Sequence, residues 1–259
     1  MDENQESNPE DTPDKKRSRG LIKKNLQKFK HLIGRSWRGY LMDTMVVIIG
    51  ITVSFSLNNQ KEEGAREKLA HGYLYSLLSD VESDIKELNH VMEETRGVID
   101  KTTRLISITE LDDLSRLDTI EFLEDIKVVL SRPSFISKDA TFSDMKSSGN
   151  VQLIDDVKLK NLIFEYYRVY EIVKMNQLAE REATITITGP YLFRRFPLRS
   201  ISKSSGQHRN LDIKRIVDEV EFENNLLLRL SNRQELLDSY QEALRLGMEL
   251  RNGLKKRTK

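Results

Sequence analysis

The side chains that could carry out acid–base or metal chemistry are spread thinly along this chain. Its 259 residues include four histidines and no cysteine. No two histidines share metal-ligand spacing, and none stands in an acidic cluster, so the sequence predicts neither a metal site nor a bound cofactor. We expect exposed or half-exposed histidines. They are His31, His71, His90 and His208.

Two kinds of short motif resemble catalytic groups. Ser147-Ser148-Gly149 offers a hydroxyl nucleophile, but the frame Gly-x-Ser-x-Gly is missing, so we interpret it as a helix end with capping serines. The pairs Asp112-Asp113 and Asp155-Asp156 offer two carboxylates for acid–base work. Both pairs stand where helices are expected to begin, and carboxylates there bind the free N–H groups. Capping is therefore the favoured interpretation of both pairs.

Three tyrosines, Tyr166, Tyr167 and Tyr170, could stack against a ligand, but a buried aromatic helix face explains them more simply. No glycine-rich phosphate loop is present in the sequence. We therefore predict no catalytic, cofactor-binding or metal-ligating residue, and we do not expect an enzyme. An enzyme with an unrecognised site is retained as an alternative.

The segment 40–57, YLMDTMVVIIGITVSFSL, is the strongest feature of the sequence and predicts a transmembrane helix. Eighteen helical residues extend about 27 Å, which is close to the roughly 30 Å thickness of a bilayer's hydrocarbon core. Its one ionisable residue, Asp43, lies a single turn from the entry end, where a carboxylate can reach the headgroups. A buried core helix and a cleaved signal peptide are the alternatives. The cleavage site around Ser54-Phe55-Ser56 is poor, and forty residues precede the apolar run.

The charges beside the span predict its orientation. Residues 15–38 contain ten Lys or Arg and no acidic residue, whereas the residues just after the span are mixed in sign. The positive-inside rule then places the N-terminus in the cytoplasm and residues from 58 onward outside it. Residues 15–39 form a basic juxtamembrane segment whose positions 15–38 also attract anionic lipid. Nucleic acid is a less favoured partner, because no aromatic residues are interleaved with the charge.

The residues after the span predict one helical domain, 58–254. Five prolines, twelve glycines and 32% charged residues favour long helices, and the lack of cysteine excludes disulfides. Ten positions after the span, separated alternately by four and three residues, form a heptad pattern, and eight of these ten residues are apolar. Those positions are Leu74, Leu78, Val81, Ile85, Leu88, Met92, Thr95, Ile99, Thr102 and Ile106.

The heptad pattern suits either an intramolecular bundle or a coiled-coil dimer, and we favour the bundle because more helices follow. Gly50 and Ser54 form a small-xxx-small pair inside the span, which leaves a homodimer open. The fold class predicted is thus all-α. One transmembrane helix continues into an exported helical bundle whose long first helix carries the heptads.

Helix starts and stops divide the rest of the domain. A break is expected at 111–118, then a short helix capped by Thr119 that stops before Pro133. Asp139 or Thr141 caps a second short helix that closes at Gly149. Asp155 and Asp156 begin a long helix, whose apolar face is Leu159, Leu162, Ile163, Tyr166, Tyr170 and Val173.

The last third of the chain is less regular. ATITITG, 183–189, is locally strand-like, although a helix end or turn at Gly189-Pro190 suits the context equally well. A mobile polar loop is expected at 197–210, a disordered acidic tail at 1–14 and a solvated basic tail at 255–259. A final helix is expected over 221–254, with Leu226, Leu230, Leu237, Tyr240, Leu244 and Met248 facing inward.

Three segments together resemble a known family. They are VVIIGITVSFSLNNQKEE at the membrane, TFSDMKSSGNVQLIDDVKLKNLIFEYY in the centre and FENNLLLRLSNRQELLDSYQEAL near the end. The family is a bacterial group of single-pass membrane proteins, classed as a domain of unknown function. The resemblance implies an architecture and a location but no reaction. The acidic-then-basic N-terminal extension departs from the family's pattern.

These observations predict a membrane-anchored protein that acts through binding. The favoured role is an interaction, scaffold or sensor-like module outside the cytoplasmic membrane, with another protein as its partner. The alternative is an adaptor on the cytoplasmic side, whose basic segment 15–38 binds anionic lipid or nucleic acid.

Overall fold

The computed structural model describes residues 13–196 and 211–258, and before Gly39 it describes only the side chain of Trp37. All regular elements in these ranges are helical, which confirms the all-α prediction. The predictions of a mobile loop at 197–210 and of a disordered tail up to residue 12 fall outside the described residues. So do the side chains of the basic segment, apart from Trp37.

The chain divides into two units, residues 1–65 and 66–259. The first unit contains most of the first helix, α1 (Pro13–Thr109), including the predicted span. Every side chain from Tyr40 to Leu57 is exposed. By length and composition this is the one helix among the described residues that could cross a membrane. Thr44 and Thr52 donate their hydroxyls to the carbonyls of Tyr40 and Ile48, so their polar groups are satisfied within the helix.

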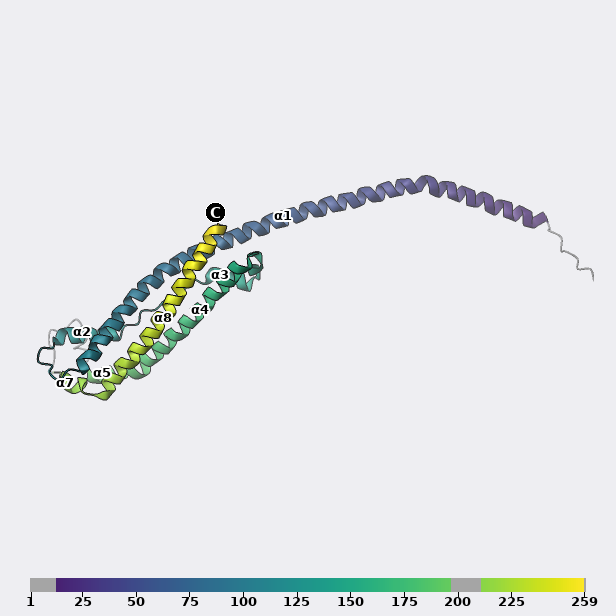
Figure 1. Cartoon of the computed structure of the whole chain (residues 1–259). Helices are drawn as coiled ribbons and strands as arrows, with labels where there is room; N and C mark the ends of the chain where they lie inside the picture. The colour runs from purple at the N-terminus through teal and green to yellow at the C-terminus, as the bar shows by residue number, and fades with distance from the viewer. Residues whose placement is uncertain (1–12, 197–210, 259) are drawn as a thin grey trace, which may run out of the picture. The chain divides into compact units, whose positions relative to one another are not determined.

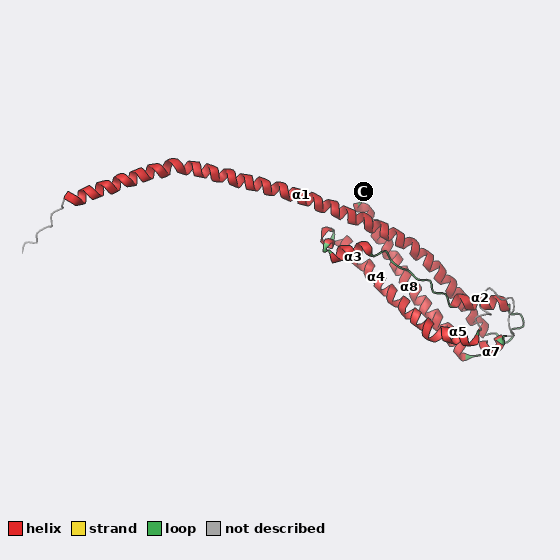
Figure 2. Ribbon diagram, turned by 180° about the vertical axis from the view of Figure 1, so that it is seen from behind, coloured by secondary structure: helices red, strands yellow, loops and turns green. Residues whose placement is uncertain are grey.

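The second unit is a bundle built on three long helices. Figures 1 and 2 show the last part of α1 beside α4 and α8, with α2, α5 and α7 gathered at one end. The elements after α1 are α2 (Thr119–Val129), α3 (Ala140–Ser147), the 3₁₀ turn η1 (Asn150–Leu153), α4 (Val157–Ala183), the π-helical turn η2 (Thr184–Thr188), α5 (Gly189–Arg195), α7 (Ile213–Val217) and α8 (Val220–Arg257).

The heptad positions of α1 face the interior of this bundle. Six of the ten predicted positions are buried, and the other four are half-buried. Toward the ends of the seam the most buried residue lies one position away from the predicted one, as with Leu77, Val98 and Leu105. The seam is thus core within a single chain, as an intramolecular bundle requires.

The apolar faces of α4 and α8 complete the core. On α4 five of the six predicted residues are buried and Leu162 is half-buried. On α8 the predicted face is largely confirmed, since two of its six residues are buried and three are half-buried, whereas Met248 is 40% exposed and Gly247 beside it is buried. The buried stripe of α8 also includes Arg229 and Arg233, which a search for apolar residues alone does not find.

Helix boundaries agree with the sequence in outline, and two capping predictions are wrong. Asp118, not Thr119, caps α2, because its carboxylate accepts the N–H groups of Ile120 and Glu121. At the start of α3 the side chain of Asp139 makes no capping bond. Gly149 ends that helical turn at φ 75°, where a glycine meets no Cβ clash.

Residues 255–257 of the predicted basic tail continue α8 beyond the predicted end at 254, and their side chains are exposed. The helix continues to Arg257. Lys255 forms an ion pair with Glu82 of α1 at 2.7 Å, and Arg257 pairs with Asp156 at the start of α4 at 2.6 Å. These pairs join α8 to α1 and to the start of α4, and because they are solvent-accessible they contribute little stability.

Candidate functional site

An extended segment, residues 131–139, crosses the helical bundle between α2 and α3, and we call it the strap. It begins because α2 cannot continue into Arg132-Pro133. Since no strand among the described residues lies beside it, its backbone N–H and C=O groups need side-chain partners. Gln177 of α4 supplies both partners at the centre: its amide oxygen accepts from the N–H of Phe135 at 2.9 Å, and its amide nitrogen donates to the carbonyl of Phe135 at 3.0 Å.

A buried carboxylate holds the far end of the strap. Asp84 of α1 accepts hydrogen bonds from the N–H of Lys138 at 2.8 Å, from the hydroxyl of Ser137 and from the hydroxyl of Tyr166 at 2.8 Å. Burial raises the pKa of Asp84, and the three donors oppose that shift. Tyr166 remains a proton donor, because burial and the nearby Asp84 both raise its pKa.

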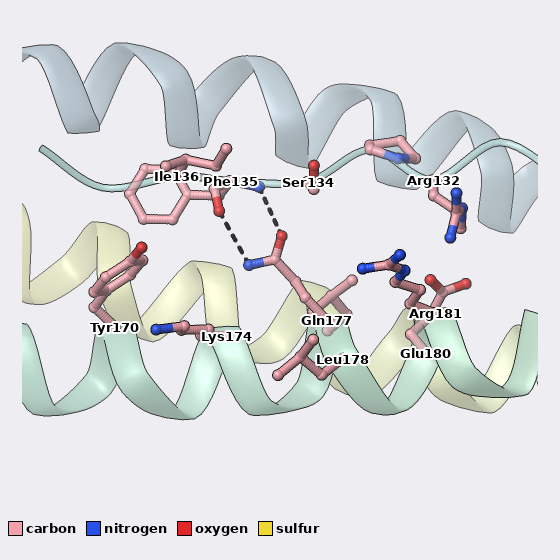
Figure 3. Close-up of a pocket in the computed structure, with 12 residues that line it drawn as sticks. Arg132, Ser134, Phe135, Ile136, Tyr170, Lys174, Gln177, Leu178, Glu180 and Arg181 are labelled. Carbon is pink, nitrogen blue, oxygen red and sulfur yellow. Dashed lines mark hydrogen bonds between the residues drawn. The ribbon is translucent and has the colours of Figure 1, made fainter.

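The strap and α4 enclose a pocket of about 490 Å³, which Figure 3 shows from the side. This volume is within the range of small-molecule sites. One wall is the strap, the other is α4, and Leu236 of α8 also lines the pocket. The lining residues are Arg132, Pro133, Ser134, Phe135, Ile136, Tyr170, Lys174, Gln177, Leu178, Glu180, Arg181 and Leu236.

The charged groups of the pocket are mostly cationic. Arg132, Lys174 and Arg181 are exposed at its edge. The nearest carboxylate to Lys174 is that of Glu171, at 3.9 Å. Within the part of the chain that the structure describes, Arg132 and Arg181 form no ion pair. Their charges therefore remain available to a ligand.

The acidic residue of the pocket, Glu180, is already engaged by two buried arginines of α8. Its Oε1 accepts from Arg229 and lies 3.0 Å from Nη2 of Arg233. Both arginines are fully buried. They also donate to backbone carbonyls: Arg229 to Val129 and Ser131, and Arg233 to Ser131. This group, Glu180 with Arg229 and Arg233, is called the buried triad below.

The buried triad carries one positive charge in excess. Burial, together with the charges of Arg233 and Arg132, lowers the pKa of Arg229 to about 9. Burial is also the main cause that lowers the pKa of Arg233 to about 10. Both arginines are still protonated at neutral pH. Nε and Nη1 of Arg233 have no hydrogen-bond acceptor among the described residues.

The π-helical turn η2 supplies one further side chain that forms hydrogen bonds with the buried triad. Thr184 is buried there, donates its hydroxyl to Glu180 and accepts from Arg229. Pro190 follows in α5 and has no N–H, so a regular α-helix could not continue through it unaltered. A wider π turn accommodates such a break, and π turns are frequent at functional sites. The locally strand-like run 183–189 is thus helical.

Of the candidate residues identified from sequence, only Tyr170 lines this pocket, and the serine, aspartate and tyrosine candidates do not converge on a common site. Ser148 donates to the carbonyl of Asp144 and so closes α3, as expected of a capping serine. Asp156 caps α4 through the N–H groups of Lys158 and Leu159. Asp113 accepts from the N–H of Ser115 in the turn after α1, and no helix begins there, so the capping prediction for Asp112-Asp113 is also wrong.

The described histidines are also separate. His71 contacts the ring of Tyr75 edge-on, and His90 lies 3.6 Å from Glu94. No group of three or more His, Cys, Asp or Glu residues in the described ranges could hold a metal ion. The side chains of His31 and His208 lie outside those ranges.

Sequence reasoning missed the residues that form the pocket and the buried triad. Arg132, Gln177 and Arg181 are ordinary polar residues in sequence, and their convergence depends on where the strap runs. Arg229 and Arg233 did carry a signal, because they are four residues apart on the buried face of α8. Long charged residues at core positions are almost never fully buried unless paired.

Comparisons with known protein families, with functionally characterised proteins and with solved structures find no match to this chain.

Proposed function

We propose that this chain is a membrane-anchored interaction or sensor-like module that acts by binding and not by catalysis. The observation that carries this proposal is the preformed pocket between the strap and α4. Its carboxylate, Glu180, is held by Arg229 and Arg233, so it is poorly placed to transfer protons. The free groups at the pocket are cations, which can bind and orient a partner group.

The proposed location is a bacterial inner membrane, crossed once, with the N-terminus in the cytoplasm and the bundle in the periplasm. Two observations support it. The exposed apolar helix over 40–57 needs an apolar environment to cover it. The ten basic residues of 15–38 precede it with no acidic residue between them. The resemblance of three segments to a family of single-pass proteins agrees with this location.

Topology is tested with a phosphatase reporter that folds only outside the cytoplasm. Fused after Lys259, it is expected to be active, because the basic segment keeps the other end inside. Fused after Ser36, before the span, the same reporter should be inactive. Activity at Ser36 with none at Lys259 would reverse the proposed orientation.

The binding role is tested by purifying the full chain in a mild detergent. We expect one defined protein to copurify at a fixed ratio, because a scaffold or sensor domain acts through a specific contact. A variant that retains residues 1–57 but lacks 58–259 serves as the control and should lose that protein. A chain that purifies alone, or a partner retained by the control, contradicts the proposal.

A second candidate function rests on the ten cations of 15–38. In this alternative the segment is a cytoplasmic adaptor for anionic lipid or nucleic acid, and the bundle serves as an anchor. Its binding would weaken steeply with salt, since each contact is electrostatic.

A further inference from the structure

We propose that the pocket between the strap and α4 binds a small organic anion, with its carboxylate or phosphate group at Arg132 and Arg181 and its apolar body against Phe135, Ile136 and Leu178. This inference rests on the proposed function, since it names the chemistry of a ligand for the same pocket. A free metabolite and a lipid-derived acid share this chemistry.

The pocket and its surroundings carry an excess of positive charge. Counting Arg132, Arg181 and the buried triad, and leaving out Lys174 because it pairs with Glu171, there are four cations and one carboxylate. In the view of Figure 3, Arg132 and Arg181 lie toward the same end of the pocket as Glu180. Like charges so grouped repel one another, and a bound anion relieves that repulsion.

The buried donors of Arg233 point to the same conclusion. Its Nε and Nη1 have no acceptor in the part of the chain that the structure describes. A buried donor without an acceptor costs free energy of folding. Arg233 also contacts Glu180 of the pocket wall and Ser131 at the edge of the strap. Arg233 therefore adds unbalanced positive charge directly behind the wall.

The apolar half of the pocket defines the rest of the ligand. Ile136 is 73% exposed and Leu178 is 54% exposed, although both line the cavity. Phe135, beside Ile136 on the strap, is buried and meets the ring of Tyr170 edge-on, with centroids 5.8 Å apart. A hydrocarbon or aromatic body would cover these surfaces and remove them from water. An inorganic anion would leave them uncovered.

The pocket is preformed, which favours binding without reordering of its walls. Gln177 uses both ends of its amide on the backbone of Phe135. It therefore positions the wall and is not free to bind a ligand. The anion must be recognised by the arginines, whose planar guanidinium groups match carboxylate and phosphate oxygens.

The test uses the full chain in nanodiscs of zwitterionic lipid and measures binding by calorimetry. The probes are phenyl phosphate, phenylacetate, the neutral benzyl alcohol and inorganic phosphate. We expect both phenyl anions to bind saturably and more tightly than benzyl alcohol or inorganic phosphate. Arg132→Glu and Arg181→Glu should each weaken the phenyl anions by at least about tenfold, because each reverses a contacting charge.

Lys158→Glu is the matched control, since Lys158 is an exposed cation of α4 outside the pocket. It should leave binding unchanged, and circular dichroism should show that all three variants fold. The inference is overturned if neither phenyl anion binds, or if benzyl alcohol or inorganic phosphate binds as tightly as they do. It is also overturned if Lys158→Glu weakens binding of the phenyl anions as much as the two arginine variants do. If a partner still copurifies while the anions do not bind, the pocket assignment alone is wrong.

Discussion

Glu180→Gln is expected to destabilise the helical unit by about 3–5 kcal/mol, the range found when one partner of a buried ion pair is removed. Gln has the size of Glu and can still accept a hydrogen bond, so the substitution removes mainly the charge. Arg229 and Arg233, both fully buried, then have no carboxylate between them. Urea unfolding of the full chain, followed by circular dichroism, measures the difference in unfolding free energy.

Glu182→Gln provides the control for that measurement. Glu182 is an exposed acid two residues further along α4, and its loss should change the unfolding free energy by less than about 0.5 kcal/mol. If Glu180→Gln is as mild as this control, the triad does not need its carboxylate. Water or another acceptor would then be balancing the two arginines.

The parts of the fold that the sequence could predict depend on local periodicity. The span over 40–57, the heptad positions of α1 and the tyrosine face of α4 each follow from spacing within one helix. The C-terminal glycine at Gly149 and the cap at Asp156 also follow from rules that act over a few residues. These features need no knowledge of which segments lie side by side.

The pocket could not be predicted because it depends on contacts between segments far apart in the chain. Gln177 meets Phe135 across 42 positions, and Arg229 meets Val129 across 100. Nothing in the run RPSFISK indicates that its backbone is bound by side chains of three helices. Core arginines are exceptions to the rule that charged residues lie on the solvent face, which explains why Arg229 and Arg233 were not predicted to belong to the buried face of α8.

The two polar clusters hold the strap at different points, so they affect the pocket differently. The buried triad binds the carbonyl of Ser131 at the start of the strap, next to the pocket residue Arg132. Asp84 binds Ser137 and Lys138, beyond the pocket residue Ile136. Both clusters therefore position the strap wall without lying in the pocket's apolar half.

Asp84→Ala is expected to destabilise the helical unit by about 3–5 kcal/mol. It leaves the N–H of Lys138 and the hydroxyls of Ser137 and Tyr166 without their acceptor, at about 1–3 kcal/mol for each buried unsatisfied group. Urea unfolding measures this loss. Because the strap is released beyond Ile136, binding of phenyl phosphate should weaken as well. Unchanged stability would show that the strap is held without Asp84.

Asp84→Asn separates the charge of this residue from its role in packing. Burial raises the pKa of Asp84 above its ordinary 3.8, so the folded chain binds a proton more tightly than the unfolded chain does. The contribution of Asp84 to stability therefore falls as pH rises above that value, and the Asn variant lacks this dependence. Relative to wild type, Asp84→Asn should therefore be more destabilising near pH 4, about the ordinary pKa of Asp, than near pH 7.

Asp100→Asn, at an exposed position of the same helix, serves as the control and should follow the wild-type pH profile of stability. An Asp84→Asn difference that is constant over this range would mean that folding leaves the pKa of Asp84 unchanged, so that its three donors cancel the effect of burial.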